Sequence, residues 1–350
     1  MPINNPPLKS SPSILADCVE LRTLADMEGY FRLNNLKRYW DTTRETEESD
    51  PSGQQREEDD TDLEGVSGGD EDKFLDALCD ELAERSHNLS DSYPFVFNTN
   101  GLRFSIKGDL SEGAMVYLFC LLLTHPSTDD ILNGSWKPDI NNVTRDLFQA
   151  CSTLAAAGHV SGSAISFGWP RPNDNPPFLV RLKEVYDLFG EGKVVSSPKP
   201  GAAPMVKDEE IDVIAWRPQP CKTPGTFYLL GQVASGDNWE DKSLKSGIPY
   251  FHRTWFETPP ASDATPSIFI PHFVQQKGNG NRRDRIDLLT AKFGHIIDRL
   301  RLPRYAKDAI DLVDSGTCTF YIERRDDIPK VIDWVNSQKL ALQAAGTVPL

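Results

Sequence analysis

The sequence lacks the patterns that mark several common classes of protein. Its six cysteines stand singly, with no CxxC pair, which favours reduced side chains in a cytoplasmic protein over a disulfide framework. The longest apolar stretch, around residues 115–123, is too short to cross a bilayer. The opening MPINNPPLKSSPS does not have the charged and then apolar layout of a signal peptide. We therefore expect a soluble, cytoplasmic protein without a membrane partner.

Motifs of several enzyme classes are missing as well. The segment GEGKVVSS is similar to part of a phosphate-binding loop but does not complete one. Asp187, just before it, stands where the loop needs its first glycine, and Val194 stands where Ser or Thr must bind magnesium. There is no GxSxG elbow of a serine hydrolase, and KGNGNRR lacks the third glycine and the preceding strand of a dinucleotide-binding fingerprint. His159, His252 and His295 show no metal-ligand spacing with one another or with cysteine, so zinc is not expected.

Negative charge is abundant but unevenly placed. The chain has 350 residues, enough for one large or two modest domains, and a net charge of −15. Residues 41–73 hold fourteen acidic residues against three basic ones, so this segment contributes −11 and the rest of the chain only −4. Because this segment has almost no apolar side chains to bury, we expect it to be a disordered acidic linker.

Positive charge gathers in the C-terminal quarter of the chain. Between positions 277 and 308, nine Lys and Arg residues stand against four Asp residues. Such a surplus can bind a phosphate backbone, or it can be a solvated helix face next to a basic loop. The first interpretation makes DNA a candidate partner. The residues predicted to contact nucleic acid are Lys277, Arg282, Arg283 and Arg285.

Hydrophobic periodicity divides the chain into five regions. A helical N-terminal segment (1–40) precedes the acidic linker (41–73), a helical region (74–138), an α/β core (139–275) and a basic helical C-terminal region (276–350). Within these regions the pattern predicts a buried helix over residues 113–124 and further helices over 141–157, 177–190, 285–302 and 328–343. Strands are predicted near residues 163–170 and 267–274. The core then reads helix, strand, hairpin, helix, strand, which indicates the α/β fold class.

The hairpin is predicted from residues 211–216 and 226–234. The first run alternates, with Ile211 and Val213 on one side and Asp212 and Ile214 on the other, and the second run has the same period of two. Proline and glycine between the runs turn the chain, so the two strands are expected to be antiparallel.

The faces of this hairpin predict a metal site. A turn centred near Cys221 pairs Glu210 with Gln232 and places both on the face that carries Asp212, unless a bulge or an odd register separates them. Clustered carboxylates are unfavourable without a neutralising cation, and a small set of oxygen ligands suits Mg²⁺, or Mn²⁺ in its place. Such a cation can polarise a phosphate and generate hydroxide.

These residues resemble a known nuclease superfamily. A helix, a strand bearing Asp, a strand ending in an acid or Gln, a lysine and a following helix is the layout of the PD-(D/E)XK nucleases. Asp212 matches their metal-binding Asp, and Gln232 matches the second position of the glutamine-bearing, Mrr-like variant. The segments IDVIAW and GTFYLLGQVASGDNW resemble a bacterial group of restriction endonuclease-like proteins of anti-phage defence. The resemblance covers about residues 139–275. It implies a restriction endonuclease-like core, with a mixed central sheet and flanking helices, plus helical additions at both ends.

The sequence also departs from the superfamily. Ala234 stands where the lysine is usual, and Lys242 is the substitute from the following helix. Gln149 matches a Glu that the preceding helix often carries, and Glu210 or Glu191 could supply the missing charge. The resemblance thus implies a catalytic set of Asp212, Gln232, Lys242, Glu210 and Gln149, and a metal-binding set of Asp212, Gln232 and Glu210.

Two functions are expected from this resemblance. The first is a magnesium- or manganese-dependent DNA endonuclease that serves as the effector of an anti-phage or restriction system. The second is a catalytically inactive protein of the same fold that binds DNA or a partner protein as a scaffold or sensor, which Ala234 and the two amides favour. Other subunits of a defence complex are candidate partners, and a homo-oligomer is left open. The acidic linker is expected to shield the basic surface.

Overall fold

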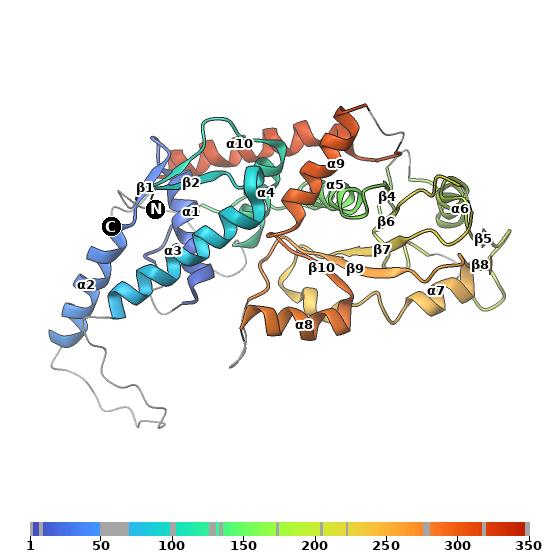
Figure 1. Ribbon diagram of the computed structural model, residues 1–350, viewed down its shortest axis with the longest axis horizontal. Helices are drawn as coiled ribbons and strands as arrows, with labels where there is room; N and C mark the ends of the chain where they lie inside the picture. The colour runs from blue at the N-terminus through green and yellow to red at the C-terminus, as the bar shows by residue number, and fades with distance from the viewer. Residues whose placement is uncertain are drawn as a thin grey trace, which may run out of the picture.

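The computed structural model describes most of the chain, with helices packed on two larger sheets (Figure 1). The described residues are 3–6, 10–49, 70–98, 103–125, 131–132, 136–172, 175–203, 206–221, 223–275, 281–316 and 320–346. For residues 44–49, 70–72 and 98 this description covers the backbone alone. Within these stretches, no helix has both the length and the apolar composition needed to cross a bilayer.

The N-terminal part consists of helices around a three-stranded sheet. In this sheet β3 lies between β1 and β2 and is antiparallel to both. α4 is buried from Gly113 to Leu123 because it is apolar on all sides, which confirms the predicted buried helix. The elements are α1 (Pro12–Ala25), β1 (Tyr30–Arg32), α2 (Asn34–Ser49), α3 (Asp70–Leu89), η1 (Ser90–Ser92), β2 (Phe95–Asn98), β3 (Arg103–Ile106) and α4 (Glu112–Thr124).

The predicted acidic linker is helical at both of its ends. α2 continues to Ser49, and α3 begins at Asp70, so the expectation of irregular structure throughout residues 41–73 is wrong at these ends. Glu is a good helix former, and both acidic ends extend helices whose other turns pack against the N-terminal part. Residues 50–69 lie outside the described residues, and so does the centre of the predicted linker.

The second part is an α/β layer on a mixed five-stranded sheet, in agreement with the predicted fold class. The strand order is β10-β9-β7-β6-β4, with β4, β6 and β7 antiparallel and β7, β9 and β10 parallel. The elements are α5 (Asn142–Val160), β4 (Ser163–Ser166), α6 (Phe178–Phe189), β5 (Lys193–Val194), β6 (Val213–Trp216), β7 (Tyr228–Val233), η3 (Asp237–Asp241), α7 (Ile248–Trp255), β8 (Phe256–Thr258), β9 (Thr265–Phe269), α8 (Arg282–Phe293), β10 (His295–Ile297), α9 (Leu302–Asp314), η4 (Arg325–Asp327) and α10 (Ile328–Ala345).

Different helices cover the two faces of the five-stranded sheet. α5 and α9 lie on one face, where Val213, Ala215 and Leu229 share a hydrophobic cluster with α5 (Figure 1). α6 and α7 provide the cluster on the other face, which contains Ile214 and Leu230. Neighbouring strand residues thus point to opposite faces, as the period of two predicts.

The sheet extends beyond the predicted core boundary at residue 275. The single helix predicted over residues 285–302 is wrong, because α8 ends at Phe293 and β10 then pairs in parallel with β9. Gly294 allows the chain to pass from helix α8 to strand β10. Its φ is +81°, and a Cβ there would lie 2.1 Å from the Pro266 carbonyl oxygen. A side chain at this position would therefore prevent β10 from approaching β9. α9, which was not predicted as a separate helix, follows directly.

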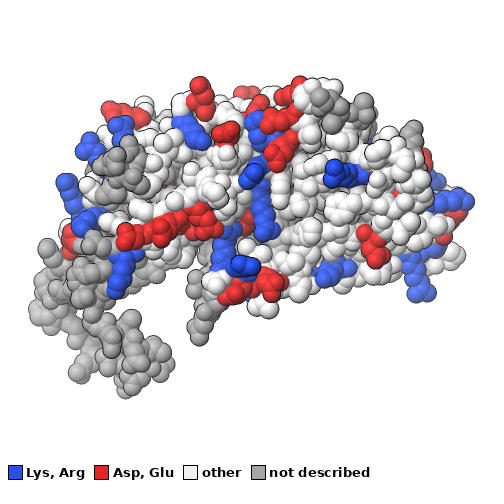
Figure 2. Space-filling view, in the orientation of Figure 1, with Lys and Arg blue, Asp and Glu red and all other residues white. Residues whose placement is uncertain are grey.

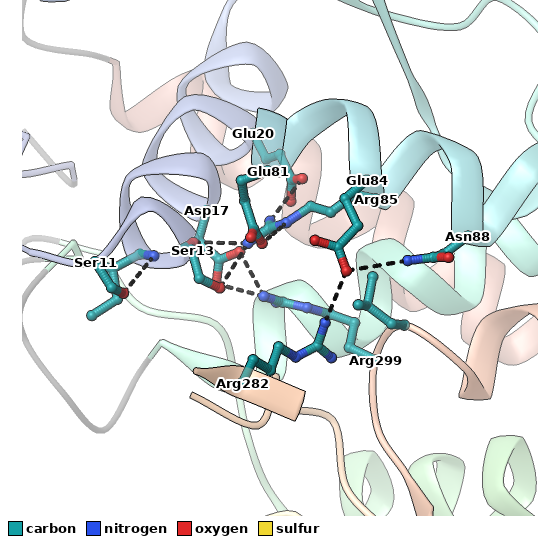
Figure 3. Close-up of polar contacts among 12 residues, drawn as sticks. Ser11, Ser13, Asp17, Glu20, Glu81, Glu84, Arg85, Asn88, Arg282 and Arg299 are labelled. Atoms are coloured by element: carbon teal, nitrogen blue, oxygen red, sulfur yellow. Dashed lines mark hydrogen bonds and ion pairs between the residues drawn. The ribbon is translucent and has the colours of Figure 1, made fainter. Parts of the chain in front are cut away.

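A buried ion network joins the N-terminal part to the sheet. Arg85 Nη1 lies 2.6 Å from Asp17 Oδ1 and 2.9 Å from Glu20 Oε1, and Arg299 Nη2 lies 2.5 Å from Asp17 Oδ2 (Figure 3). Both arginine side chains are fully buried, and Phe273 lies about 4 Å from each guanidinium. One hydrophobic cluster also runs from α1 and α4 to α5, α9 and α10. This cluster therefore crosses the boundaries between the predicted regions.

Candidate active site

A cavity of about 570 Å³ opens between α5, the start of β6, the end of β7 and η3. We call it the Asp212 cavity. Its polar lining residues include Arg145, Gln149, Asp212, Ser235, Asp237 and Lys242. These side chains come from three separate segments of the chain, so the fold, rather than local sequence, assembles the site.

α5 places Gln149 at this cavity. The helix begins at an Asn141 capping box, in which the Asn141 side chain accepts from the Thr144 backbone N–H, in agreement with the predicted start at residue 141. Gln149 Nε2 donates to Ser166 Oγ over 2.8 Å, which leaves the Gln149 carbonyl oxygen free to face a ligand. The helix continues past Gly158, where it was expected to stop. Glycine is needed at this position because α9 packs closely against it: a Cβ there would lie 1.9 Å from the Tyr305 carbonyl oxygen.

The Asp212 side chain is turned by a bulge at the start of β6. The backbone N–H groups of Phe167 and Gly168 both donate to the Asp212 carbonyl oxygen, over 2.7 and 3.0 Å. On its other side, the Asp212 N–H donates to the Gly231 carbonyl oxygen over 2.8 Å, although Val213 is the residue that pairs with Gly231. Ile211 therefore packs in the same cluster as Ile214, and the alternation predicted from sequence breaks between them. The Asp212 carboxylate instead accepts from the Val233 backbone N–H over 2.7 Å.

Gly168 shows how closely the site residues pack. A Cβ on Gly168 would lie 2.4 Å from Asp212 Oδ1, 2.8 Å from Gln149 Nε2 and 2.9 Å from Gln149 Oε1. The carboxylate and the carboxamide thus converge on one point of the backbone. Only glycine leaves room for both at their present positions.

The Asp212 carboxyl group holds its proton unusually well. Burial raises its pKa to about 7, and nearby Asp208 and Glu210 raise it as well. The hydrogen bond from Val233 and the charge of Lys242 act in the opposite direction but are weaker. A carboxylate in this position gains from a cation, because a cation compensates the charge that burial disfavours.

Gln232 and Glu210 do not line the Asp212 cavity. The predicted pairing of Glu210 with Gln232 is wrong by two residues: Val213 pairs with Gly231, so Asp212 lies across from Gln232. Gln232 shares its face of β7 with Leu230, away from the α5 side, and its Oε1 atom is buried without a hydrogen-bond partner. Glu210 is exposed, and its backbone N–H donates to Asp208.

Of the five predicted catalytic residues, the structure brings together Gln149, Asp212 and Lys242. Arg145 and Asp237 complete the charged lining and were not predicted. Asp237 lies in the GDN segment after β7, where a Gly-Asp-Asn sequence is typical of a turn and carries no specific signal for a ligand. Arg145 lies one helical turn before Gln149, so its place on the same side of α5 follows from the helix once Gln149 is chosen.

The cavity can accept a magnesium ion only through few protein ligands. Within the described residues, no group of three or more His, Cys, Asp or Glu side chains is arranged to hold a metal ion. The oxygens available are those of Asp212, Asp237 and Gln149. Mg²⁺ keeps several waters and is commonly bound by one or two carboxylates, so this donor set fits it.

The predicted DNA-contacting arginines lie at the start of α8, beside a groove of about 800 Å³. Arg282 pairs with Asp298 and Arg285 with Glu240, each over 2.6 Å, whereas Arg283 is exposed. Figure 2 shows the acidic side chains of α3 across from the basic side chains of α8 and α9. Two of the three arginines are therefore neutralised within the protein. Lys277 lies outside the described residues.

Comparisons with known proteins add no relative to this description. No protein-family model, no curated protein and no solved structure matches the chain.

Proposed function

We propose that the five-stranded sheet and its helices form a restriction endonuclease-like core, and that the protein is a cytoplasmic, divalent-cation-dependent DNA endonuclease of phage defence. The observation that carries this proposal is the Asp212 cavity, which gathers Gln149, Asp212 and Lys242 from three separate segments. The chain order α5, β4, β6–β7, α7, β9 also supports it, because it follows the succession helix, strand, hairpin, helix, strand.

Each side chain of the cavity has a role in this proposal. Asp212 and Asp237 would hold the cation, which supplies charge neutralisation at a phosphate and an activated water. Lys242 stabilises the negative charge that develops on the phosphate. Gln149 is held by its hydrogen bond to Ser166, so its carbonyl oxygen could serve as a further ligand of the cation.

A second candidate function is favoured by the direction of Gln232. Because Gln232 lies on the other face and Ala234 is buried, the second strand contributes no acid and no lysine to the cavity. A protein of this fold without hydrolytic activity would still bind DNA or a partner protein. Arg145 and Lys242 could then hold a phosphate without cleaving it.

Plasmid cleavage separates the two functions. We expect purified protein to cleave supercoiled plasmid when Mg²⁺ or Mn²⁺ is present, and Asp212→Asn to reduce the rate roughly a hundredfold or more, since losing a stabilising group commonly costs that much. Lys242→Ala should reduce the rate as well. Asp241→Asn is the matched control, because Asp241 is exposed in the same segment and does not line the cavity.

The result that contradicts hydrolysis is equally specific. If the wild type binds labelled DNA in a mobility-shift assay but cleaves neither single- nor double-stranded substrate with either cation, the binding function holds instead. Cleavage that Asp212→Asn leaves intact would show that another site is responsible.

A further inference from the structure

A second cavity, of about 260 Å³, lies on the other side of the η3 segment from the Asp212 cavity. Its walls come from α1, the end of α4, η3 and the residues that follow β9. The polar side chains that form it include Asp17, His125, Asp237, Glu240 and His272. It therefore lies at the seam where the N-terminal part meets the sheet.

Two imidazole nitrogens at this cavity lack hydrogen-bond partners. His125 Nε2 lies 2.6 Å from Asp17 Oδ2, which leaves His125 Nδ1 buried and unpartnered. His272 has a hydrogen bond with the Gly236 backbone, and His272 Nε2 is likewise buried and unpartnered. The two histidines are 4% and 8% exposed. Buried polar atoms are rarely left without a partner, so each of them indicates a missing hydrogen-bond partner.

The charges around this cavity indicate the chemistry of the missing hydrogen-bond partner. Apart from the two histidines, every ionisable side chain among the described lining residues is acidic. Asp17 is neutralised by Arg85 and Arg299, and Glu240 by Arg285, but the Asp237 carboxylate has no hydrogen bond or ion pair within the described residues. Burial lowers the pKa of His272 to about 4, so its ring is neutral near pH 7 and Nε2 carries a lone pair. His272 Nε2 and the Asp237 carboxylate are therefore free acceptors, and Asp237 carries a negative charge.

We propose that this second cavity binds a small organic cation of the amine or guanidine class, whose N–H groups donate to His272 and Asp237. Trp239 supplies an aromatic wall, on which the carbon chain of such a ligand can pack. Asp237 also lines the Asp212 cavity, so a bound cation would fix the segment that carries Lys242. Binding itself does not depend on the proposed nuclease activity.

Calorimetry on the full-length protein tests this proposal with agmatine as the probe. The buffer contains EDTA, which excludes binding through a contaminating metal. We expect saturable one-to-one binding of agmatine. The control ligand 4-guanidinobutyrate has nearly the same length but carries a carboxylate in place of the amine. It should bind roughly tenfold more weakly or not at all, because the acidic lining repels it.

Variants assign the site. Asp237→Asn and His272→Phe should each weaken agmatine roughly tenfold, since each removes one acceptor. Asp241→Asn should leave the affinity unchanged, because Asp241 does not line this cavity. Asp237 and Asp241 are both exposed, so these two substitutions do not threaten folding.

Three results would overturn the proposal. They are no saturable heat with agmatine at millimolar concentration, equal binding of 4-guanidinobutyrate, or affinity that both Asp237→Asn and His272→Phe leave intact. If Zn²⁺, titrated without EDTA, binds the wild type tightly and His272→Phe abolishes that binding, the histidines form a metal site instead.

Discussion

At the scale of single residues, Asp212 is the most informative side chain of the protein. Its carboxylate accepts a backbone hydrogen bond from Val233, which by itself would favour the charged form. Burial and the neighbouring carboxylates of Asp208 and Glu210 outweigh this and raise the pKa to about 7. An acid that is held neutral up to physiological pH within a cavity is a common feature of functional sites.

The raised pKa of Asp212 predicts how stability depends on pH. The folded protein keeps this proton up to about pH 7, whereas the unfolded chain releases it at about pH 4. Between these values the folded state binds more protons, so the free energy of unfolding falls as the pH rises. We expect Asp212→Asn to be more stable than wild type by about 1–2 kcal/mol at about pH 8, because solvent at the cavity screens part of the full effect.

Urea unfolding of both proteins at two pH values checks this prediction. The amide of Asn can still accept from the Val233 N–H, so the backbone contact is kept. The pH-dependent part of the difference in unfolding free energy should disappear by about pH 3, where Asp212 is neutral in the folded state and mostly neutral in the unfolded chain. A difference of the same size at both pH values would show that Asp212 ionises normally.

At the scale of elements, the bulge between β4 and β6 decides which side chains meet. The predicted alternation holds within β6 and β7, but the assignment of Asp212 to the face of Ile214 is wrong. Asp212 and Val213 both lie opposite Gly231, since the Asp212 N–H donates to the Gly231 carbonyl oxygen, so the alternation shifts before Val213. Asp212 therefore meets Gln149 rather than Gln232.

Gly168→Ala tests this geometry directly. The added methyl group would lie 2.4 Å from Asp212 Oδ1, so the carboxylate, Gln149 or the bulge must move. We expect a loss of about 1–3 kcal/mol in unfolding free energy, as for other overpacked sites, and loss of whatever cleavage the wild type shows. Gly108→Ala is the control, since nothing lies within 4 Å of its added Cβ. If the two variants behave alike, Gly168 does not hold the site together.

At the scale of the whole molecule, buried charges connect the two ends of the chain. Asp17 in α1 contacts Arg85 in α3 and Arg299 after β10, all with almost no exposure (Figure 3). Burial alone would raise the pKa of Asp17, but Arg299 and Arg85 outweigh it and hold the pKa below its usual range. The stability that Asp17 contributes is therefore present above about pH 4 and is lost as the pH falls further.

Arg299→Met should destabilise the protein strongly. It leaves the Asp17 carboxylate buried with part of its compensation removed, and breaking a buried pair in this way costs about 3–5 kcal/mol. Arg325→Met is the matched control, because Arg325 pairs with a half-exposed Asp314 over 3.2 Å and such pairs contribute about 0–1 kcal/mol. Chemical denaturation measures both. Similar losses in the two variants would mean that the Arg299 network does not join the parts of the molecule.

The sequence by itself determined the elements whose pattern is local. Continuous apolar composition identifies α4, and an alternating period with a Pro- and Gly-rich turn identifies the β6–β7 hairpin, because burial of an apolar face depends on residues close in sequence. It also indicated Asp212, Lys242 and Gln149 as residues of one site.

Only the tertiary structure decided where those side chains point. The bulge depends on hydrogen bonds from Phe167 and Gly168 to Asp212, and the course of β10 depends on Gly294 approaching Pro266. The second cavity exists only because α1 and α4 lie against the segment after β7. Contacts between such distant segments follow from the packing of the whole chain, and no local pattern encodes them.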